Sequence, residues 1–148
     1  MNSHELEPTQ IILVDDEAQV RQSLSQALEI KGYQVLALDS AEAAIAKITR
    51  ELNGVVISDY HMPGKNGIEL LRQINAMDAE IPVIILTGHA DVEVAVEAMR
   101  SGAYDFLEKP FSMQRLSEKV ARAAEKRQLR LENRQLKLEV GSSRRASP

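Results

Sequence analysis

The stretch GVVISDYHMPGKNG, residues 54–67, joins an apolar run to an acid and then to a turn rich in Pro and Gly. A short apolar run bounded by turn residues is typical of a strand buried on both faces, and this one is followed by Asp59. An earlier apolar run, residues 11–14, ends in the same way on Asp15 and Asp16. The sequence therefore predicts two buried strands that both end on carboxylates.

Apolar runs alternate with helical patterns along most of the chain. The segments between the runs place apolar residues three or four positions apart, as amphipathic helices do. Five strands that alternate with helices predict crossover connections and a parallel sheet covered on both faces. We therefore expect an α/β fold of the flavodoxin-like, doubly wound kind, with five strands in the order 2-1-3-4-5 and an extended C-terminal helix. The predicted strands are residues 11–14, 35–38, 55–57, 83–86 and 104–107.

Individual residues mark the predicted helix ends. Gly32 is a predicted stop for the first helix, and Ser40 is a predicted N-cap for a second helix that runs to Leu52. The fourth helical pattern carries its large apolar residues on one face, at Val92, Val96 and Met99.

Composition and charge narrow the classes of function. The 148-residue chain has no cysteine, which excludes disulfides and thiolate chemistry. No apolar run approaches the ~20 residues that a membrane helix needs, and no signal peptide is visible, so we expect a cytoplasmic protein without membrane contact. Residues 1–114 carry 8 Lys/Arg and 18 Asp/Glu, whereas residues 115–148 carry 10 and 4. The acidic part is a poor partner for phosphate backbones and the basic part is typical of a solvated helix face, so we expect no direct nucleic-acid binding.

The predicted strand order brings Asp15, Asp16 and Asp59 to one edge of the sheet. Strands one and three are neighbours about 4.8 Å apart, and their carboxyl ends form the crevice where the strand order reverses. Thr87 and Lys109 follow strands four and five at the same edge. Three carboxylates so close together repel one another unless a cation joins them, and Mg2+ prefers oxygen ligands.

A carboxylate, a Mg2+ site, a hydroxyl and an ammonium group together suit phosphoryl transfer to an oxygen atom. The chemistry predicts attack by Asp59 on an activated phosphoryl donor, which gives an aspartyl phosphate. Lys109 and the metal would neutralise charge on the transferred group, and Thr87 would hydrogen-bond a phosphate oxygen of the product. A single Asp after a strand is more often a helix cap or turn residue, but five such residues at one edge are hard to explain as caps.

The motifs VDDE, ISDYHMPGKNG, ILTGHAD and GAYDFLEKPF stand in this order along the chain. Together they resemble a two-component response-regulator receiver domain over residues 9–124. The resemblance implies that Asp59 is the phosphoacceptor, and that Asp15 and Asp16 hold Mg2+ with the backbone carbonyl of His61. It also implies a sensor histidine kinase as the donor, and no enzymatic turnover beyond self-phosphorylation and autodephosphorylation.

The same resemblance implies a switch in a phosphoprotein. Thr87 is the switch hydroxyl, Lys109 binds phosphate, and Phe106 matches the aromatic switch position. Phosphate draws Thr87 toward it, Phe106 fills the vacated space, and the face between strands four and five is remodelled. From the residues alone, Phe106 is equally a core aromatic. His61 and His89 are either tuners of the phosphate lifetime or solvated loop side chains.

The last helical pattern starts near Ser112 and continues without Gly or Pro as far as Gly141. A d-a-d-a spacing within it predicts a coiled coil and a homodimer through this linker helix. The resemblance to receiver domains implies that the last strand–helix face also takes part in the homodimer. The spacing covers only about two heptads, so an amphipathic linker helix is the alternative. The residues at these positions are Leu129, Asn133, Leu136 and Val140.

The linker sequence LENRQLKLEV resembles that of nitrogen-regulatory and dicarboxylate-transport regulators. These place a receiver before an ATPase that acts on the alternative sigma factor and before a DNA-binding domain. No P-loop motif is present here, so the resemblance implies an absent output domain and control of transcription. The expected domains are a disordered tail at 1–8, the receiver at 9–124, the linker helix or coiled coil at 125–140 and a disordered tail at 141–148.

Two other classes of function fit part of the pattern. A Mg2+-dependent hydrolase with Asp59 as nucleophile would need a general acid, which only His61 or His89 could supply. A structural dimerisation module with a vestigial pocket would bind no Mg2+, and its oligomeric state would not respond to phosphate.

Overall fold

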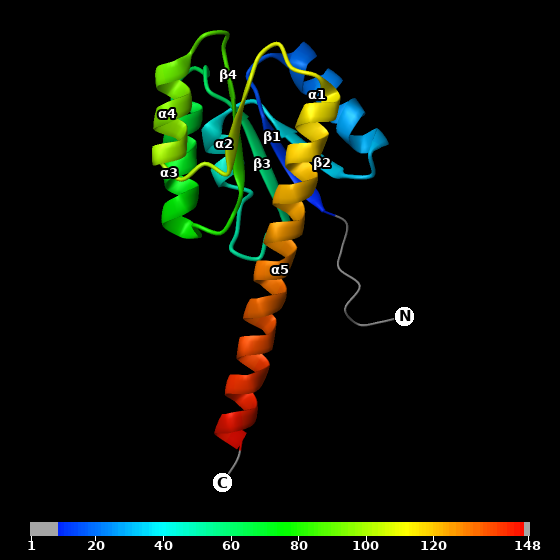
Figure 1. The fold of residues 1–148 in the computed structure, drawn as a ribbon, viewed down its shortest axis with the longest axis vertical. Helices are drawn as coiled ribbons and strands as arrows, with labels where there is room; N and C mark the ends of the chain where they lie inside the picture. Colours follow the sequence, from blue (N-terminus) through cyan, green and yellow to red (C-terminus); the bar gives the residue numbers. More distant parts are fainter. Residues whose placement is uncertain (1–8, 147–148) are drawn as a thin grey trace.

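The computed structural model describes the backbone of residues 9–146 and the side chains of residues 9–139. Five parallel strands form one sheet in the order β2-β1-β3-β4-β5 (Figure 1). This order confirms the predicted fold class. The strands are β1 (Gln10–Val14), β2 (Gln34–Leu38), β3 (Gly54–Asp59), β4 (Val83–Thr87) and β5 (Asp105–Glu108).

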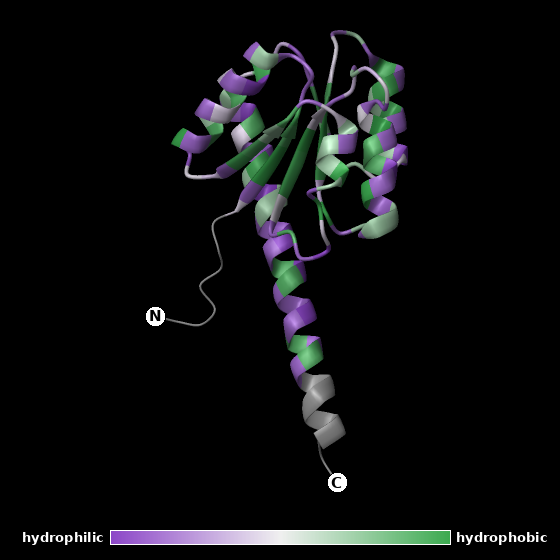
Figure 2. Cartoon of the chain, turned by 180° about the vertical axis from the view of Figure 1, so that it is seen from behind, coloured by the Kyte–Doolittle hydropathy of each residue, from purple (hydrophilic) through white to green (hydrophobic). Residues whose placement is uncertain are grey.

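Helices cover both faces of the sheet. One face packs against α1 (Ala18–Ile30) and α5 (Met113–Ala146). The other packs against α2 (Ala41–Ile45), α3 (Gly67–Met77) and α4 (Val92–Arg100), as Figure 1 shows. Every residue of β3 and β4 is buried, as expected for strands enclosed between two helical layers. Figure 2 shows these apolar strands in the interior, between helices in which hydrophobic and hydrophilic residues alternate.

Local sequence signals account for several helix ends. Ser40 caps α2, because its Oγ accepts a hydrogen bond of 3.1 Å from the Ala43 amide. Asn66 and Glu69 form a reciprocal capping box at the start of α3, just after the Asp59 loop. Gly32 follows α1 with a φ of +98°, a conformation that Gly adopts without strain.

Two helical predictions differ from the structure. Helix α2 ends at Ile45 rather than Leu52, because the backbone after it continues through tighter bonds such as Lys47 N–H to the Ala44 carbonyl. Ile48 and Leu52 are nevertheless buried. Their apolar spacing therefore indicated side chains that pack into the core, although the backbone there is not α-helical. In α4 the predicted apolar face is exposed, and small residues on the adjoining face pack inward. The exposed residues are Val92, Val96 and Met99, and the buried ones are Ala95 and Ala98.

Helix α5 leaves the body of the domain and continues well beyond it (Figure 1). It passes through Gly141 and reaches Ala146, so the expected tail at 141–148 is wrong at least as far as residue 146. An isolated Gly weakens a helix by about 1 kcal/mol relative to Ala, which does not by itself end one. The expected tail at 1–8 and residues 147–148 lie outside the described part of the chain. Within that part, no helix is both long enough and apolar enough to cross a membrane.

Candidate functional site

The three acids lie together at the carboxyl edge of the sheet. Asp59 is the last residue of β3, and Asp15 and Asp16 follow the neighbouring strand β1. A carboxylate oxygen of each lies within 4.8 Å of the others. Asp15 is fully buried and Asp59 is 5% exposed, whereas Asp16 faces solvent. The cluster is therefore walled by protein on one side and open to an incoming ligand on the other.

Lys109 and Thr87 complete this edge. The Lys109 Nζ lies 3.3 Å from Asp59 Oδ1 and 4.0 Å from Asp15 Oδ2, so one ammonium group faces two of the acids. Thr87 is the buried last residue of β4, and its carbonyl accepts a 2.9 Å hydrogen bond from the Lys109 amide. The Lys109–Pro110 peptide bond is cis. The structure thus brings together all five residues that the sequence places at this edge.

The electrostatics of Asp15 favour a bound cation. Burial raises the pKa of Asp15, and the charges of Asp59 and Asp16 raise it further, against the Glu17 amide and Lys109, which lower it. Its Oδ1 accepts a 2.9 Å hydrogen bond from the Glu17 amide. Its Oδ2 is buried and accepts no hydrogen bond. A divalent cation with oxygen ligands would both satisfy this atom and relieve the repulsion, so the residues present fit Mg2+.

Two supporting residues were not singled out from the sequence. A Cβ at Gly67 would lie 2.6 Å from the Asp59 carbonyl oxygen, so only glycine lets α3 begin directly against this strand end. The Asn-Gly pair before α3 is a turn signal that could have indicated it. Arg21, on α1, donates a 2.7 Å hydrogen bond to the Asp15 carbonyl and fixes the backbone beneath the cluster. No sequence signal separates Arg21 from an ordinary exposed arginine.

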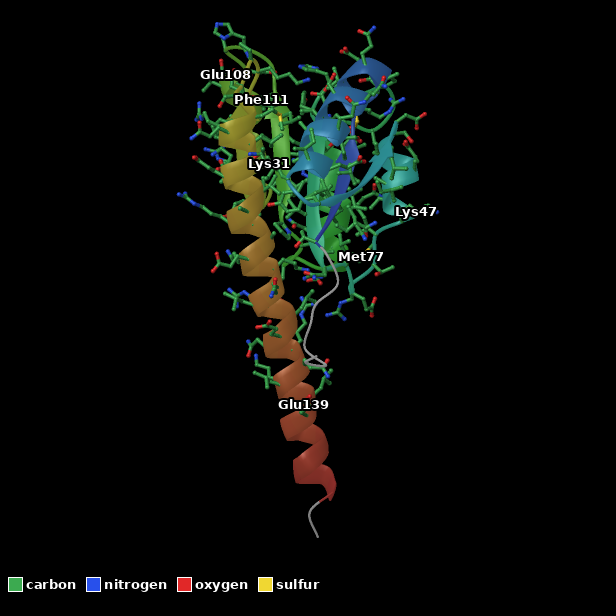
Figure 3. All side chains as sticks on the ribbon, turned by 90° about the vertical axis from the view of Figure 1, so that its right-hand side faces the viewer. Lys31, Lys47, Met77, Glu108, Phe111 and Glu139 are labelled. Atoms are coloured by element: carbon green, nitrogen blue, oxygen red, sulfur yellow. The ribbon has the colours of Figure 1, made fainter. Side chains whose placement is uncertain are left out.

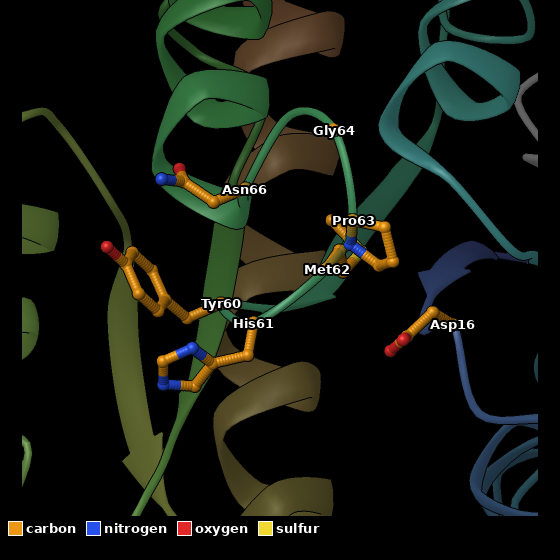
Figure 4. Close-up of a pocket in the computed structure, with 7 residues that line it drawn as sticks. All are labelled: Asp16, Tyr60, His61, Met62, Pro63, Gly64 and Asn66. Atoms are coloured by element: carbon orange, nitrogen blue, oxygen red, sulfur yellow. The ribbon is translucent and has the colours of Figure 1, made fainter.

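A surface opening of about 510 Å³ lies beside the cluster. Asp16 borders it on one side and the loop between β3 and α3 on the other, and His61 and Pro63 are among the loop residues that line it (Figure 4). The opening gives a phosphoryl donor access to the acids. The metal-ligand role of the His61 carbonyl stays a prediction.

Both histidines near the site are exposed, and a ring nitrogen of each lies close to a carboxylate oxygen. His61 Nε2 lies 3.3 Å from Asp91 Oδ2, and the His61 side chain is 67% exposed. His89 Nδ1 lies 2.9 Å from Glu108 Oε1, which also accepts a hydrogen bond from the Ala90 amide. Among the described residues, neither histidine forms a hydrogen bond or ion pair with Asp59. Each side chain instead contacts a carboxylate of a neighbouring loop or strand, and the tuning role of both stays a prediction.

The remaining predicted residues lie away from the acids. Phe106 is half-buried on β5 and packs against the core formed with α2, α3 and α4. On α5, Leu129 and Leu136 are 58% and 59% exposed, and Asn133 is exposed as well. The side chain of Val140 lies outside the described residues. The three described coiled-coil positions are therefore not covered by their own domain.

Residues 11–121 match the family described as response regulator receiver domain, and the chain belongs to that family. The match confirms the resemblance found in the sequence. The chain is 52% identical over 121 residues to the C4-dicarboxylate transport transcriptional regulatory protein DctD of Pseudomonas aeruginosa. It is 46% identical over 113 residues to the transcriptional regulatory protein FixJ of Rhizobium meliloti.

These relatives are longer than the present chain. The alignment covers 82% of this chain and 26% of DctD, and 76% of this chain and 55% of FixJ. The chain thus spans about a quarter of one relative and about half of the other.

Solved structures agree with the fold. The crystal structure of FixJ-N has a TM-score of 0.74 at 43% identity, covering 81% of this chain and 96% of that one. A response regulator receiver domain protein from Clostridium thermocellum has a TM-score of 0.77 at 35% identity, covering 82% and 98%.

Proposed function

We propose that this chain accepts a phosphoryl group on Asp59 from a sensor histidine kinase and controls an output domain in response. The observation that carries the proposal is the grouping of Asp59 with Asp15, Asp16 and Lys109 at one edge of the sheet, beside an opening that Asp16 borders. Membership of the receiver family supports the same assignment. The chain turns over no external substrate and acts in the cytoplasm.

The chemistry is a transfer between two nucleophiles. An Asp59 carboxylate oxygen forms a bond to phosphorus while the bond from phosphorus to the imidazole nitrogen of the kinase breaks, and the nitrogen keeps the electron pair. The product is an acyl phosphate on Asp59. The Lys109 ammonium group, 3.3 Å from this carboxylate, stabilises the negative charge on the phosphoryl oxygens during the transfer. Bound Mg2+, held by Asp15, Asp16 and Asp59, would supply further charge neutralisation.

The readout uses the neighbouring strand ends. Thr87 hydrogen-bonds a phosphate oxygen, and Phe106 moves into the space that Thr87 leaves. The positions of the two residues support this step. Thr87 is the last residue of β4, and Phe106, on β5, pairs with Ile85 of β4. A shift at this strand pair would alter the face formed by β5 and α5.

The partner is a second copy of this chain. Leu129 and Leu136 lie exposed on one line of α5, with Asn133 between them, which supports a parallel coiled coil. A DctD-like ATPase and DNA-binding output domain would follow this helix and control transcription. The names of the relatives, both transcriptional regulatory proteins, support this step.

Intact mass measurement with light scattering tests the proposal. The purified chain is incubated with Mg2+ and acetyl phosphate beside Asp59→Asn, with Asp39→Asn as the matched control, since Asp39 is an exposed acid after β2. We expect one phosphate adduct on wild type and on Asp39→Asn, none on Asp59→Asn, and a changed dimer fraction that follows the adduct. Steady phosphate release without an adduct would instead indicate a hydrolase. No adduct and no Mg2+ binding would leave a structural module.

A further inference from the structure

The largest fully buried side chain of the described residues is a charged one, Arg127 of α5. Its Nε donates a 2.8 Å hydrogen bond to the Leu52 carbonyl, and its Nη2 donates one of 2.9 Å to the Arg50 carbonyl. Its Nη1 lies 3.2 Å from Asp78 Oδ2. A guanidinium is buried in this way only when its donors are satisfied, so α5 is tied here to two loops of the receiver body.

Arg134 repeats the contact one heptad further along α5. It donates hydrogen bonds of 2.8 and 2.7 Å to both carboxylate oxygens of Asp78, and its Nε donates one of 3.0 Å to Glu80. Asp78 is 6% exposed and lies in the turn between α3 and β4. Although burial opposes it, the bonds from Arg134 and the charge of Arg127 lower the pKa of Asp78 to about 2. Two arginines therefore share one buried carboxylate.

The contact of Arg127 and Arg134 with Asp78 and Glu80 holds α5 against the domain beyond the last apolar residue that packs there. The last buried apolar residue of α5 is Ala124. Arg134 lies ten positions further on, or roughly 15 Å at 1.5 Å per residue. Among the described side chains, Arg134 is also the last of α5 with a hydrogen bond or ion pair to the receiver body.

Helix geometry relates the two arginines to the leucines of the proposed dimer. Positions seven apart lie on nearly the same side of a helix, so Arg127 and Arg134 share one face, and Leu129 and Leu136 share another. At 3.6 residues per turn, the two faces point roughly 160° apart. The arginine face is held against the Asp78 turn, so the leucine face is directed away from the body.

We propose that Arg127 and Arg134, through Asp78 and Glu80, fix the direction and rotation of α5 as it leaves the domain, and so present the line of Leu129 and Leu136 to a second copy of the chain. The inference rests on the proposed dimerisation. The four residues are positioning residues and take no part in phosphoryl transfer. These four residues, here called the clamp, lie far from the acid cluster. In Figure 3, Met77, which precedes Asp78, lies at the opposite end of the body from Glu108, which precedes Lys109.

A distance measurement within one chain tests the clamp. The chain has no native cysteine, so Gln26→Cys on α1 and Glu139→Cys on α5 introduce two specific spin-label sites, both exposed. Double electron–electron resonance is recorded on labelled chain diluted in excess unlabelled chain, which removes distances between protomers. We expect one narrow distance distribution in the otherwise unchanged chain.

Arg134→Gln is the decisive variant, because Arg134 is 28% exposed and its loss leaves Arg127 to pair with Asp78. We expect the distance distribution to broaden about two-fold, because loss of this contact lowers the free energy of local opening in this part of α5. Glu80→Gln should broaden it as well. Arg122→Gln is the matched control, because Arg122 is an exposed arginine of α5 that makes no hydrogen bond or ion pair among the described side chains, and it should leave the width unchanged. A wild-type width in Arg134→Gln would overturn the clamp.

Sedimentation of the same variants tests the link to dimerisation. We expect Arg134→Gln to raise the dimer dissociation constant about tenfold, since a freely bending helix loses more conformational freedom on pairing. An unchanged dissociation constant would overturn the presenting role. Phosphate uptake at Asp59 is measured in parallel and should not change in Arg134→Gln. Failure of wild type to take up phosphate would defeat the proposed function while leaving the distance result to be judged separately.

Discussion

Replacing Asp15 by Asn removes one charge from the acid cluster and tests the electrostatic account of the site. A pair of unit charges 4.8 Å apart repels by about 3–4 kcal/mol at an effective dielectric constant of 20, and Asp15 has two such neighbours within that distance, Asp59 and Asp16. Lys109, 4.0 Å from Asp15, returns about 4 kcal/mol by the same arithmetic. This arithmetic leaves about 3 kcal/mol of repulsion. Because Asp16 faces solvent, where its charge is screened, we expect only part of this to appear, and Asp15→Asn should stabilise the metal-free chain by about 1–2 kcal/mol.

Mg2+ should reverse the order of stability, so that wild type becomes more stable than Asp15→Asn. Ligand in roughly 100-fold excess over its Kd stabilises a protein by about 2.7 kcal/mol. We expect wild type to gain on this scale and Asp15→Asn to gain far less, because its buried amide oxygen carries no charge for the ion. Asparagine still accepts the hydrogen bond from the Glu17 amide, so the loop itself should hold.

Urea unfolding, followed by circular dichroism in EDTA and in Mg2+, measures both effects. Asp39→Asn serves as control, since it removes the same charge from an exposed acid that follows β2 outside the cluster. Asp39→Asn should behave as wild type in both buffers. The reasoning is refuted if Asp15→Asn is less stable than wild type in EDTA, or if Mg2+ stabilises it as strongly as wild type.

Three further predictions follow from single contacts. The pKa of Asp78 is lowered to about 2 in the folded chain. The stabilisation that its ionised carboxylate gives the fold is therefore fully present above the pKa of unfolded Asp, near 4, and is lost as the pH falls through about 2. Asp78→Asn should therefore destabilise the chain by about 2 kcal/mol at pH 7 and flatten the acid limb of stability against pH in urea unfolding. Gly67→Ala places a Cβ 2.6 Å from the Asp59 carbonyl oxygen, which should destabilise by about 1–3 kcal/mol and slow phosphate uptake; an unaffected melting curve would contradict this. Lys109→Gln should slow uptake from acetyl phosphate about 100-fold without loss of fold, as timed intact-mass spectra would show, whereas a wild-type rate would exclude its role in transfer.

The acid cluster could be predicted from the sequence because parallel topology constrains it strongly. Once alternating strands and helices are recognised, the carboxyl ends of neighbouring strands must share an edge. Asp15 and Lys109 directly follow strand ends and Asp59 is itself the last residue of β3, so errors of one or two residues in the predicted strand bounds did not displace them.

Features that depend on side-chain contacts across the fold could not be predicted in this way. The spacing of Val92, Val96 and Met99 predicts an amphipathic helix, but α4 packs closely through Ala95 and Ala98 and leaves the larger residues exposed. Arg127 looks like one more cation on a solvated helix. Its burial depends on Asp78, 49 positions away, and on two backbone carbonyls, which no local pattern records.

Chemical trapping of the acyl phosphate tests the central claim most directly. Borohydride reduces an aspartyl phosphate to homoserine, and trypsin places Asp59 in the peptide of residues 51–65, in which it is the only Asp. After reaction with acetyl phosphate and Mg2+, our account predicts homoserine at position 59 of wild type and nowhere else. Homoserine at Asp15 or Asp16, or none at all in a folded sample that binds Mg2+, would contradict it.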